Sequence, residues 1–170
     1  DRGGGLIYDD VLEITWLQNA SHGGTMTYDT AVAWADELEY YDSVRGVTWD
    51  DWRLPKTLPV NGETYNTAFK ADGSSDEGYN MSSPDFASPY STASEMAYMY
   101  YVNLENLGRY KYDEDEGYVE QEGWGLTNTS FFTSLIENYY WSGTADTETN
   151  AWVFYFYDGH QIWANKVSCS

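Results

Sequence analysis

The sequence has a single cysteine, Cys169, so it holds no pair that could close a disulfide within the chain. It has eight basic residues against 28 acidic ones, which gives a formal net charge of −20 at pH 7. Nucleic acids and anionic membranes repel such a chain, because binding to either depends on clustered cations. No stretch offers the roughly 18 consecutive apolar residues of a membrane-spanning helix. We therefore expect neither nucleic-acid binding nor membrane insertion.

Histidine is also scarce, since the chain has only His22 and His160. Nucleophilic catalysis requires a nucleophile beside a base, and neither histidine lies in a recognisable motif of that kind. Among 28 carboxylates, no pair is distinguished as the acid and base of a glycosidase. We therefore expect a protein that is not an enzyme.

Aromatic residues are abundant, with 8 Trp, 17 Tyr and 6 Phe in 170 residues. Each buried ring removes roughly 150–250 Å² from water, so such a core needs few aliphatic side chains. The length suits one domain over 1–170. We expect most of the tryptophans to lie in its core, namely Trp16, Trp34, Trp52, Trp141 and Trp152.

Two helices are predicted in the first two thirds of the chain. Apolar residues recur at i, i+3, i+4 and i+7 over 27–41, the spacing of an amphipathic helix. Thr92 and Glu95 form the T-x-x-E pattern of a capping box, which predicts a second amphipathic helix over 92–107, ended by Gly108. Both helices should lie on the surface.

Strands are predicted towards both ends of the chain. Alternating apolar residues over 6–17 indicate an N-terminal hairpin. Aromatic and β-branched residues predict C-terminal strands over 139–141, 151–157 and 160–165, with Asp158-Gly159 as a strong hairpin turn. The order of elements predicts an α+β fold, in which two helices flank one mainly antiparallel sheet with long loops.

Three segments between these elements have their own composition. A long irregular insertion is expected over 56–90, which is rich in Gly, Ser, Asn, Asp and Pro. The acidic stretch 110–125 should be a solvated loop. Residues 129–138 could form a short helix.

Two kinds of binding residue can be proposed from the loops. Asp72, Asp76 and Glu77 partly imitate the ligand spacing of a calcium loop, although the glycine at position 6 and the distal glutamate are missing. Calcium is therefore the one candidate cofactor, and the acidic run 113–116 is a second candidate for it. Trp124, Tyr139 and Tyr140 stand at loop or strand-edge positions, where their rings could stack on a sugar. Arg53 is expected to form a structural ion pair or to stack on a ring.

Seven blocks of this chain, in the same order, resemble the Lcl C-terminal domain family of secreted bacterial proteins. They include A-x-A-W-A in the first predicted helix, D-W-R-L-P, Y-W-S-G-T and A-W-x-F-x-F-x-x-G. The blocks occupy 1–9, 15–18, 26–35, 51–55, 94–96, 140–144 and 151–159. The resemblance implies a C-type-lectin-like fold, secretion by a bacterium, and a role at the cell surface or in the extracellular matrix.

The sequence lacks the residues that two activities of related proteins require. Formylglycine-generating oxidases share the W-R-L-P signature but need a pair of cysteines, and this chain has only Cys169. Calcium-dependent sugar-binding lectins use E-P-N or Q-P-D together with W-N-D, and this sequence contains none of these tripeptides. A calcium-dependent lectin site of that kind is therefore not expected.

The resemblance also concerns the ends of the chain. In the family one more strand follows the last hairpin, and it pairs with the first strand. If the polypeptide ends at Ser170, the first strand lacks this partner and leaves an edge that invites another chain. The residues expected in such an assembly contact are Gly5, Leu6, Ile7, Tyr8 and Cys169.

Two functions follow from these observations. The first is an extracellular, adhesin-like module that binds a glycan or another surface polymer and self-associates. The second is a structural subunit of an extracellular filament, assembled by strand exchange between copies.

Overall fold

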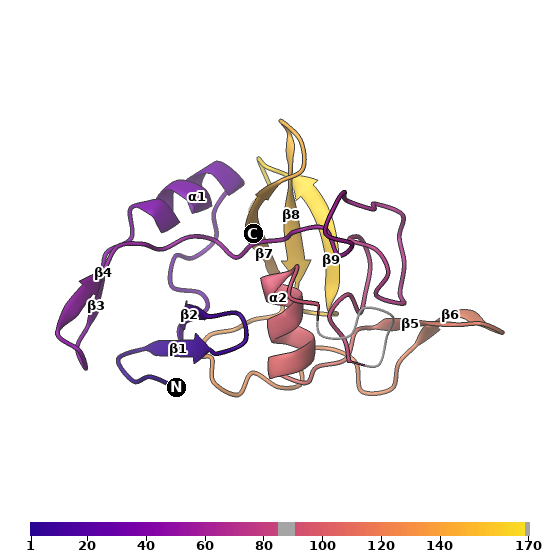
Figure 1. Cartoon of the computed structure of the whole chain (residues 1–170), viewed down its shortest axis with the longest axis horizontal. Helices are drawn as coiled ribbons and strands as arrows, with labels where there is room; N and C mark the ends of the chain where they lie inside the picture. Colours follow the sequence, from indigo (N-terminus) through magenta and orange to yellow (C-terminus); the bar gives the residue numbers. More distant parts are fainter. Residues whose placement is uncertain (85–90, 169–170) are drawn as a thin grey trace.

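The computed structural model describes residues 1–84 and 91–168, which form an α+β arrangement of short elements (Figure 1). The expected α+β class is confirmed, but the single sheet is wrong. Within the described ranges there are three separate hairpins and one three-stranded sheet, all antiparallel, because the strands of each hairpin pair only with each other. The hairpins are β1 (Leu6–Asp9) with β2 (Ile14–Leu17), β3 (Tyr40–Asp42) with β4 (Val47–Trp49), and β5 (Tyr110–Asp113) with β6 (Gly117–Glu120).

The three-stranded sheet is the centre of the fold. It consists of β7 (Tyr139–Ala145), β8 (Asn150–Tyr155) and β9 (His160–Asn165), in the order β7-β8-β9. The predicted C-terminal hairpin is confirmed, and its loop spans 156–159 because Tyr155 pairs with His160. Gly159 has a φ of +82° in this loop, a conformation that glycine adopts without strain.

Both faces of β8 bury apolar side chains. Trp152, Phe154 and Phe156 are completely or almost completely buried, and the two phenylalanines belong to the main core cluster. On the opposite face, Ala151 and Val153 pack in a second cluster. A strand that is covered on both faces loses the apolar–polar alternation of a surface strand, which is why its sequence is almost continuously apolar.

Helix α1 (Tyr28–Asp36) covers part of the second face of the sheet. Tyr28 contacts Trp141 of β7 edge-to-face, with 5.5 Å between the ring centroids. The helix begins as expected but ends five residues before the predicted position 41. The aromatic pair Tyr40-Tyr41 instead enters hairpin β3–β4, where Tyr41 pairs with Thr48.

The second helix differs more from its prediction. It consists of α2 (Glu95–Tyr98), which continues as a π-helical turn, η1 (Met99–Asn103). Its cap is Ser94, whose side chain accepts a hydrogen bond from Ala97 N, so the predicted capping box is wrong. The helix does not lie on the surface, because every residue of α2 is buried and Tyr100 has no exposed surface.

The segments between these elements differ in how well they match the predictions. The irregular insertion is confirmed over its described part, 56–84, where the structure contains no helix or strand. The acidic stretch 110–125 is not a loop, since it forms hairpin β5–β6 with the acidic run at its turn. No helix forms over 129–138, because Ser130 and Ser134 have positive φ angles of 27° and 57°.

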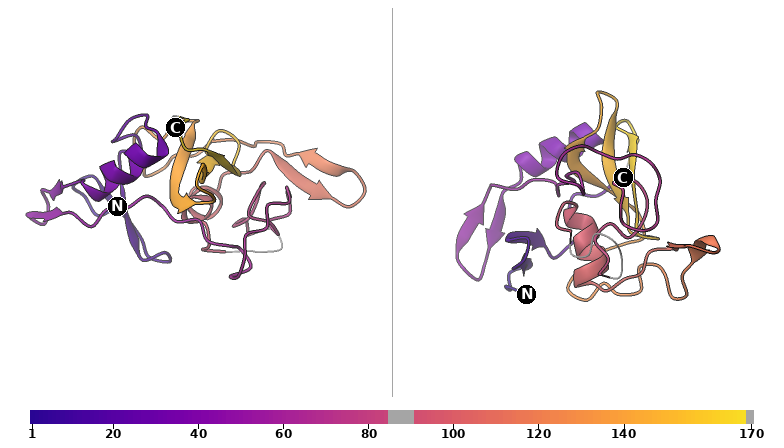
Figure 2. Two further views of the ribbon diagram at one scale, coloured as in Figure 1. Left: turned by 90° about the horizontal axis from the view of Figure 1, so that it is seen from above. Right: turned by 45° about the vertical axis from the view of Figure 1, so that its right-hand side comes forward.

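Hairpins β3–β4 and β5–β6 project from opposite ends of the long axis of the molecule. The three views agree on this arrangement (Figures 1 and 2). The central sheet with α2 lies between them, and α1 lies beside the sheet. The molecule is therefore elongated, with small exposed hairpins at both ends of a packed centre.

Candidate functional site

A cavity of about 560 Å³ lies between the N-terminal third of the chain and β7. Hairpin β1–β2, the loop 19–26, α1 and the segment 49–55 form one side, and residues at and around β7 form the other. Ligand-binding cavities of proteins typically have volumes of roughly 300–1,000 Å³. The size of this cavity therefore suits a small molecule or the end of a longer one.

Tryptophan dominates the walls of this cavity, and we call it the tryptophan cavity. Four partly exposed tryptophans line it, namely Trp16, Trp34, Trp49 and Trp52. Trp141, which is 4% exposed, also contributes to the wall. The prediction that Trp34 and Trp52 belong to the core is wrong, Trp16 is partly buried and packs against the main core cluster, and Trp141 and Trp152 are core residues as expected.

Local contacts hold these rings in place. Trp52 Nε1 donates a hydrogen bond to the backbone oxygen of Trp49 over 3.0 Å, and the Trp52 ring meets Tyr40 edge-to-face. The Trp34 ring contacts His22, with 6.2 Å between centroids. Trp16 Nε1 is buried and has no hydrogen-bond acceptor within the described part of the chain. The cavity thus combines positioned aromatic faces with an unused donor in its wall.

The charge of the cavity lining differs from that of the whole chain. Its charged side chains are Arg2, Arg45, Arg53, Glu13, Asp42, Asp51 and Glu95. Three of the four arginines in the sequence therefore lie here, together with only four of its 28 carboxylates. The lining is close to neutral on a chain with a net charge of −20.

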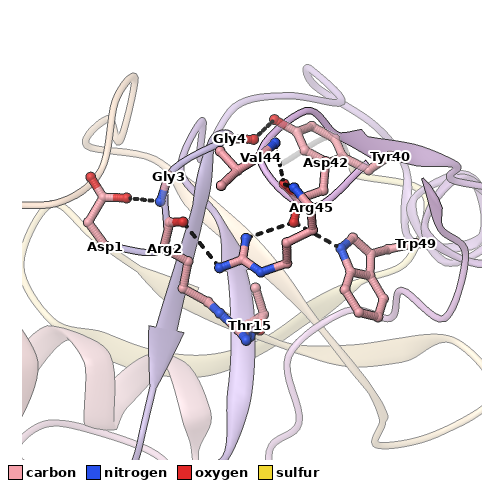
Figure 3. A network of polar contacts seen from close by, with 10 residues as sticks. All are labelled: Asp1, Arg2, Gly3, Gly4, Thr15, Tyr40, Asp42, Val44, Arg45 and Trp49. Carbon is pink, nitrogen blue, oxygen red and sulfur yellow. Dashed lines mark hydrogen bonds and ion pairs between the residues drawn. The ribbon is translucent and has the colours of Figure 1, made fainter. Parts of the chain in front are cut away.

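Asp42 connects hairpin β3–β4 to the N-terminal segment (Figure 3). Its carboxylate accepts hydrogen bonds from Arg45 Nη1 over 2.7 Å, from the backbone nitrogens of Val44 and Arg45, and from Trp49 Nε1. Arg45 in turn donates to the backbone oxygen of Arg2. Burial acts to raise the pKa of Asp42, but these hydrogen bonds lower it to about 2, so the group is an anion at neutral pH.

Arg53 fixes the segment 49–55 in the wall of the cavity. Its guanidinium makes two parallel hydrogen bonds to Glu95, of 2.8 and 2.7 Å, so the expected ion pair is confirmed. Glu95 also accepts a hydrogen bond from the backbone nitrogen of Lys56. Nearby, Gly143 N of β7 donates to Pro55 O over 2.7 Å. These bonds attach the segment that carries Trp52 to both α2 and β7.

The predicted sugar-stacking residues fall into two groups. Tyr139 and Tyr140 both line the tryptophan cavity. The Tyr140 hydroxyl accepts a hydrogen bond from Ile136 N, and Tyr139 remains 37% exposed. Trp124 is not part of the cavity. Its ring meets Tyr157 edge-to-face, and the Arg109 guanidinium lies over it, 4.9 Å from the ring centroid.

A continuous row of aromatic rings begins at the cavity, and we call it the aromatic row. Tyr139 stacks on Tyr155, its cross-strand neighbour, with centroids 4.1 Å apart and an interplanar angle of 12°. Tyr155 contacts Tyr157, and Tyr157 contacts Trp124. Side chains alternate along β8, so Tyr155 lies on the same face as Val153, beyond the part of that face which α1 covers.

The row continues from Trp124 to the tip of the molecule. Arg109 lies over both Trp124 and Tyr110, and so joins the two halves of the row. Each of the following rings contacts the next, with centroids between 4.9 and 5.9 Å apart, in the order Tyr110, Tyr79, His160, Phe69, Tyr118 and Tyr112. The last two are 49% exposed and lie on hairpin β5–β6.

The structure does not gather the three acidic residues of the calcium hypothesis into one cluster. Asp76 is completely buried, and its carboxylate accepts hydrogen bonds of 2.7 Å from the backbone nitrogens of Val60 and Asn66. Asp72 accepts hydrogen bonds from Ser74 in a local turn. Within residues 1–84 and 91–168, no three His, Cys, Asp or Glu side chains are grouped so that they could hold a metal ion. These carboxylates organise the irregular insertion instead.

The predicted assembly edge is largely closed by the chain itself. Leu6 N donates to Gly3 O, and Arg2 N donates to Leu6 O, so residues 2–3 occupy the outer edge of β1 at Leu6. The side chains of Leu6 and Ile7 are buried, and Gly5 O accepts a hydrogen bond from Gln18 N. Because hydrogen-bonding direction alternates along a strand, Tyr8 is the residue left facing outward. Cys169 lies outside the described residues.

Each of the two histidines belongs to an aromatic surface. His22 lines the cavity between Trp34 and Tyr40. His160 stacks on Tyr79 with 4.9 Å between centroids, and burial lowers its pKa below the ordinary histidine value. Both therefore contribute rings to the two surfaces described above.

Comparison with known proteins adds no relative. The sequence matches no family model, and neither curated proteins nor solved structures match it significantly. No helix in the described ranges is long and apolar enough to cross a membrane. The site must therefore be interpreted from its own geometry.

The sequence did contain one sign of the cavity. Four of the eight tryptophans fall within the first 52 residues, in short segments. So many large rings cannot all be covered by so little apolar material, since burying one tryptophan takes several neighbouring side chains. This clustering indicates that some rings in this third of the chain stay partly exposed, but not which ones.

Proposed function

We propose that this protein is a non-enzymatic, extracellular bacterial binding module that recognises a glycan in the tryptophan cavity. The observation that carries the proposal is the set of four partly exposed tryptophans around a cavity of about 560 Å³. The proposal includes a C-type-lectin-like fold and an adhesin-like role at the cell surface or in the matrix, as the sequence resemblance implies.

The chemistry of the lining favours a glycan over other ligands. The faces of sugar rings carry C–H groups that pack on aromatic faces, and their hydroxyls need donors and acceptors nearby. The cavity offers Trp34 and Trp52 as faces, and Asp51, Glu13 and Thr15 as polar partners. Because its charges nearly cancel, the lining suits a neutral glycan. Nucleic acid and membrane lipid are not expected as partners at a net charge of −20.

Two carboxylates of the cavity are unsuited to the role of a catalytic acid. A glycosidase requires one carboxylic acid that carries a proton near neutral pH. Asp42 has a pKa lowered to about 2 and is hydrogen-bonded to Arg45, while Glu95 is held by both guanidinium nitrogens of Arg53. Two of the four carboxylates in the lining are thus committed to structural ion pairs.

A glycan array with the purified protein tests this function. We expect neutral glycans to bind and to quench the fluorescence of the cavity tryptophans. The variant Trp34→Ala should weaken the array hits by at least about tenfold, because it removes one stacking face. Trp163→Ala is the matched control, since Trp163 is 41% exposed on β9 and does not line the cavity. An empty array, or equal losses in both variants, would contradict the proposal.

The alternative is a filament subunit assembled by strand exchange. The free edge that this requires on β1 is reduced to Tyr8, because residues 2–3 already bond to Leu6. Glycan binding is therefore the better supported function. Light scattering over a range of concentrations separates the two, since a stable monomer that binds glycans supports the module, and concentration-dependent polymers without ligand support the filament.

A further inference from the structure

We infer that the ligand is a long, neutral polysaccharide chain, which enters the tryptophan cavity at one point and continues across the aromatic row. This inference rests on the proposed glycan-binding function and extends it from the cavity to a second, adjoining surface. It assigns a ligand class, a polymer rather than a small saccharide, and gives the row a role in binding.

Tyr139 makes the two surfaces continuous. It lines the cavity and also stacks on Tyr155, the next ring of the row. A ligand in the cavity therefore meets the row without crossing an unrelated surface. No separate second site has to be assumed, because one chain can contact both regions in sequence.

The position of the row explains why it is free to bind. Helix α1 packs on the face of the sheet that carries Val153 and Trp141, but it does not reach Tyr155. Tyr155 and Tyr157 remain partly exposed, although large rings on a sheet face are usually covered by a second layer. Hairpin β5–β6, which carries the far end of the row, projects from the body (Figure 1).

The composition of the row suits a polysaccharide. Aromatic residues are enriched in protein interfaces as well, where they accompany a largely apolar buried core. Most rings of the row are tyrosines, which combine an aromatic face with a hydroxyl group, and no aliphatic side chain is part of it. Tyr79 is only 5% exposed and its hydroxyl donates to Asp158, so an extended neutral chain contacts the partly exposed rings on either side of it.

The charge around the row selects against acidic polysaccharides. Its far end carries the acidic run 113–116 at the turn of β5–β6, and Arg109 is already paired with Glu120 over 3.0 Å. Residues 109–122 carry six carboxylates and, besides the paired Arg109, one lysine, Lys111, so sulfated or uronic-acid chains would meet net negative charge there. A neutral polymer encounters no such repulsion.

The experiment measures binding as a function of ligand length by calorimetry. The probes are β-1,4-linked oligomers of glucose and of N-acetylglucosamine, from two to six units, and the corresponding soluble polymers. We expect affinity to increase with length by at least about tenfold from the shortest oligomer to the polymer. Trp124→Ala and the double variant Tyr112→Ala/Tyr118→Ala should remove most of this increase, while the shortest oligomer binds them as it binds the parent.

Two further variants separate this inference from the proposed function. Trp34→Ala should weaken oligomers of every length, because it acts in the cavity. Tyr41→Ala is the matched control, since Tyr41 is 64% exposed and lies outside both surfaces. Circular dichroism checks that each variant is folded.

The possible failures are distinguishable. If short and long chains bind the parent equally, or if the row variants keep the full length dependence, the inference is wrong while the cavity function stands. If the glycan array gives hits but none of these oligomers or polymers binds, the ligand is of another class and the inference is again wrong. If nothing binds in either assay, the proposed function fails as well.

Discussion

Trp152 and Trp52 show that the same type of residue is buried in one half of this molecule and partly exposed in the other. Trp152 lies in β8 and has no exposed surface, whereas Trp52 lies in an irregular segment and is only partly buried. Tyr65 of the irregular insertion packs on the ring of Trp152 and α1 covers the opposite face of β8, while the segment around Trp52 has a cavity on one side and solvent on the other. The number of layers around a ring, and not the type of ring, decides whether it stabilises the fold or remains available for a ligand.

The variant Trp152→Ala tests this comparison, and we expect it to have the largest effect on stability. Removing a completely buried indole should reduce the free energy of unfolding by about 3–5 kcal/mol. Urea denaturation measures the effect. The control is Trp163→Ala on the neighbouring strand, directly opposite Trp152 and 41% exposed, for which we expect a loss below about 1 kcal/mol. Similar losses for the two variants would contradict the layer argument.

The attachment between the two halves can be weakened through Glu95→Gln. The side chain of Glu95 is 10% exposed, and the change removes the charge that Arg53 faces while leaving the shape intact. We expect a loss of about 1–3 kcal/mol in the free energy of unfolding, because hydrogen bonds to charged groups contribute that much. Glu120→Gln breaks the more exposed pair with Arg109 and should cost between about 0 and 1 kcal/mol. The idea of a structural attachment would be refuted if Glu120→Gln were the more damaging change.

Trp52→Ala sharpens the contrast with Trp152. Since the ring is partly exposed beside a cavity, its removal should cost only about 1 kcal/mol, well below the range for buried tryptophans. Thermal denaturation monitored by circular dichroism provides the measurement. A loss as large as that of Trp152→Ala would show that the N-terminal third is packed as tightly as the sheet.

The smallest effect concerns pH. Burial lowers the pKa of His160 in the folded state, so the unfolded chain takes up a proton at higher pH than the folded one does. Stability from this group is therefore complete above the unfolded pKa of about 6.5 and decreases as the pH falls below it. Urea midpoints between about pH 7.5 and 5.5 should decrease for the parent and less for His160→Phe, which keeps a ring against Tyr79. Parallel curves for the two proteins would rule out this role of His160.

Local sequence patterns correctly predicted those parts of the fold in which neighbouring residues decide the secondary structure. The hairpin at residues 6–17, the start of the first helix and the Asp158-Gly159 turn follow from alternation, helical spacing and turn chemistry. The acidic hairpin β5–β6 was missed, because its charge suggested a solvated loop while Asp113 in fact closes a turn between two short strands. The helix expected at 129–138 was wrong, since positive φ angles at Ser130 and Ser134 exclude it.

The candidate site was predicted only in part. Tyr139 and Tyr140 were proposed from their place at a strand edge, and both line the cavity. Trp124 was proposed from its place in a loop, and it belongs to the aromatic row. Trp16, Trp34 and Trp52 were expected in the core, because a sequence pattern marks a large ring as apolar without counting the layers that cover it.

By itself the sequence determined a chain rich in aromatic rings and poor in cations, with short strands and helices set by local patterns. It did not determine which rings would be covered. Asp76 became a buried acceptor for backbone nitrogens instead of a calcium ligand, and Arg53 met Glu95 across 42 residues. Contacts between distant segments depend on which faces finally pack together, and local spacing carries no information about that. The tertiary structure alone therefore decided that four tryptophans surround a cavity and that ten rings form a continuous row.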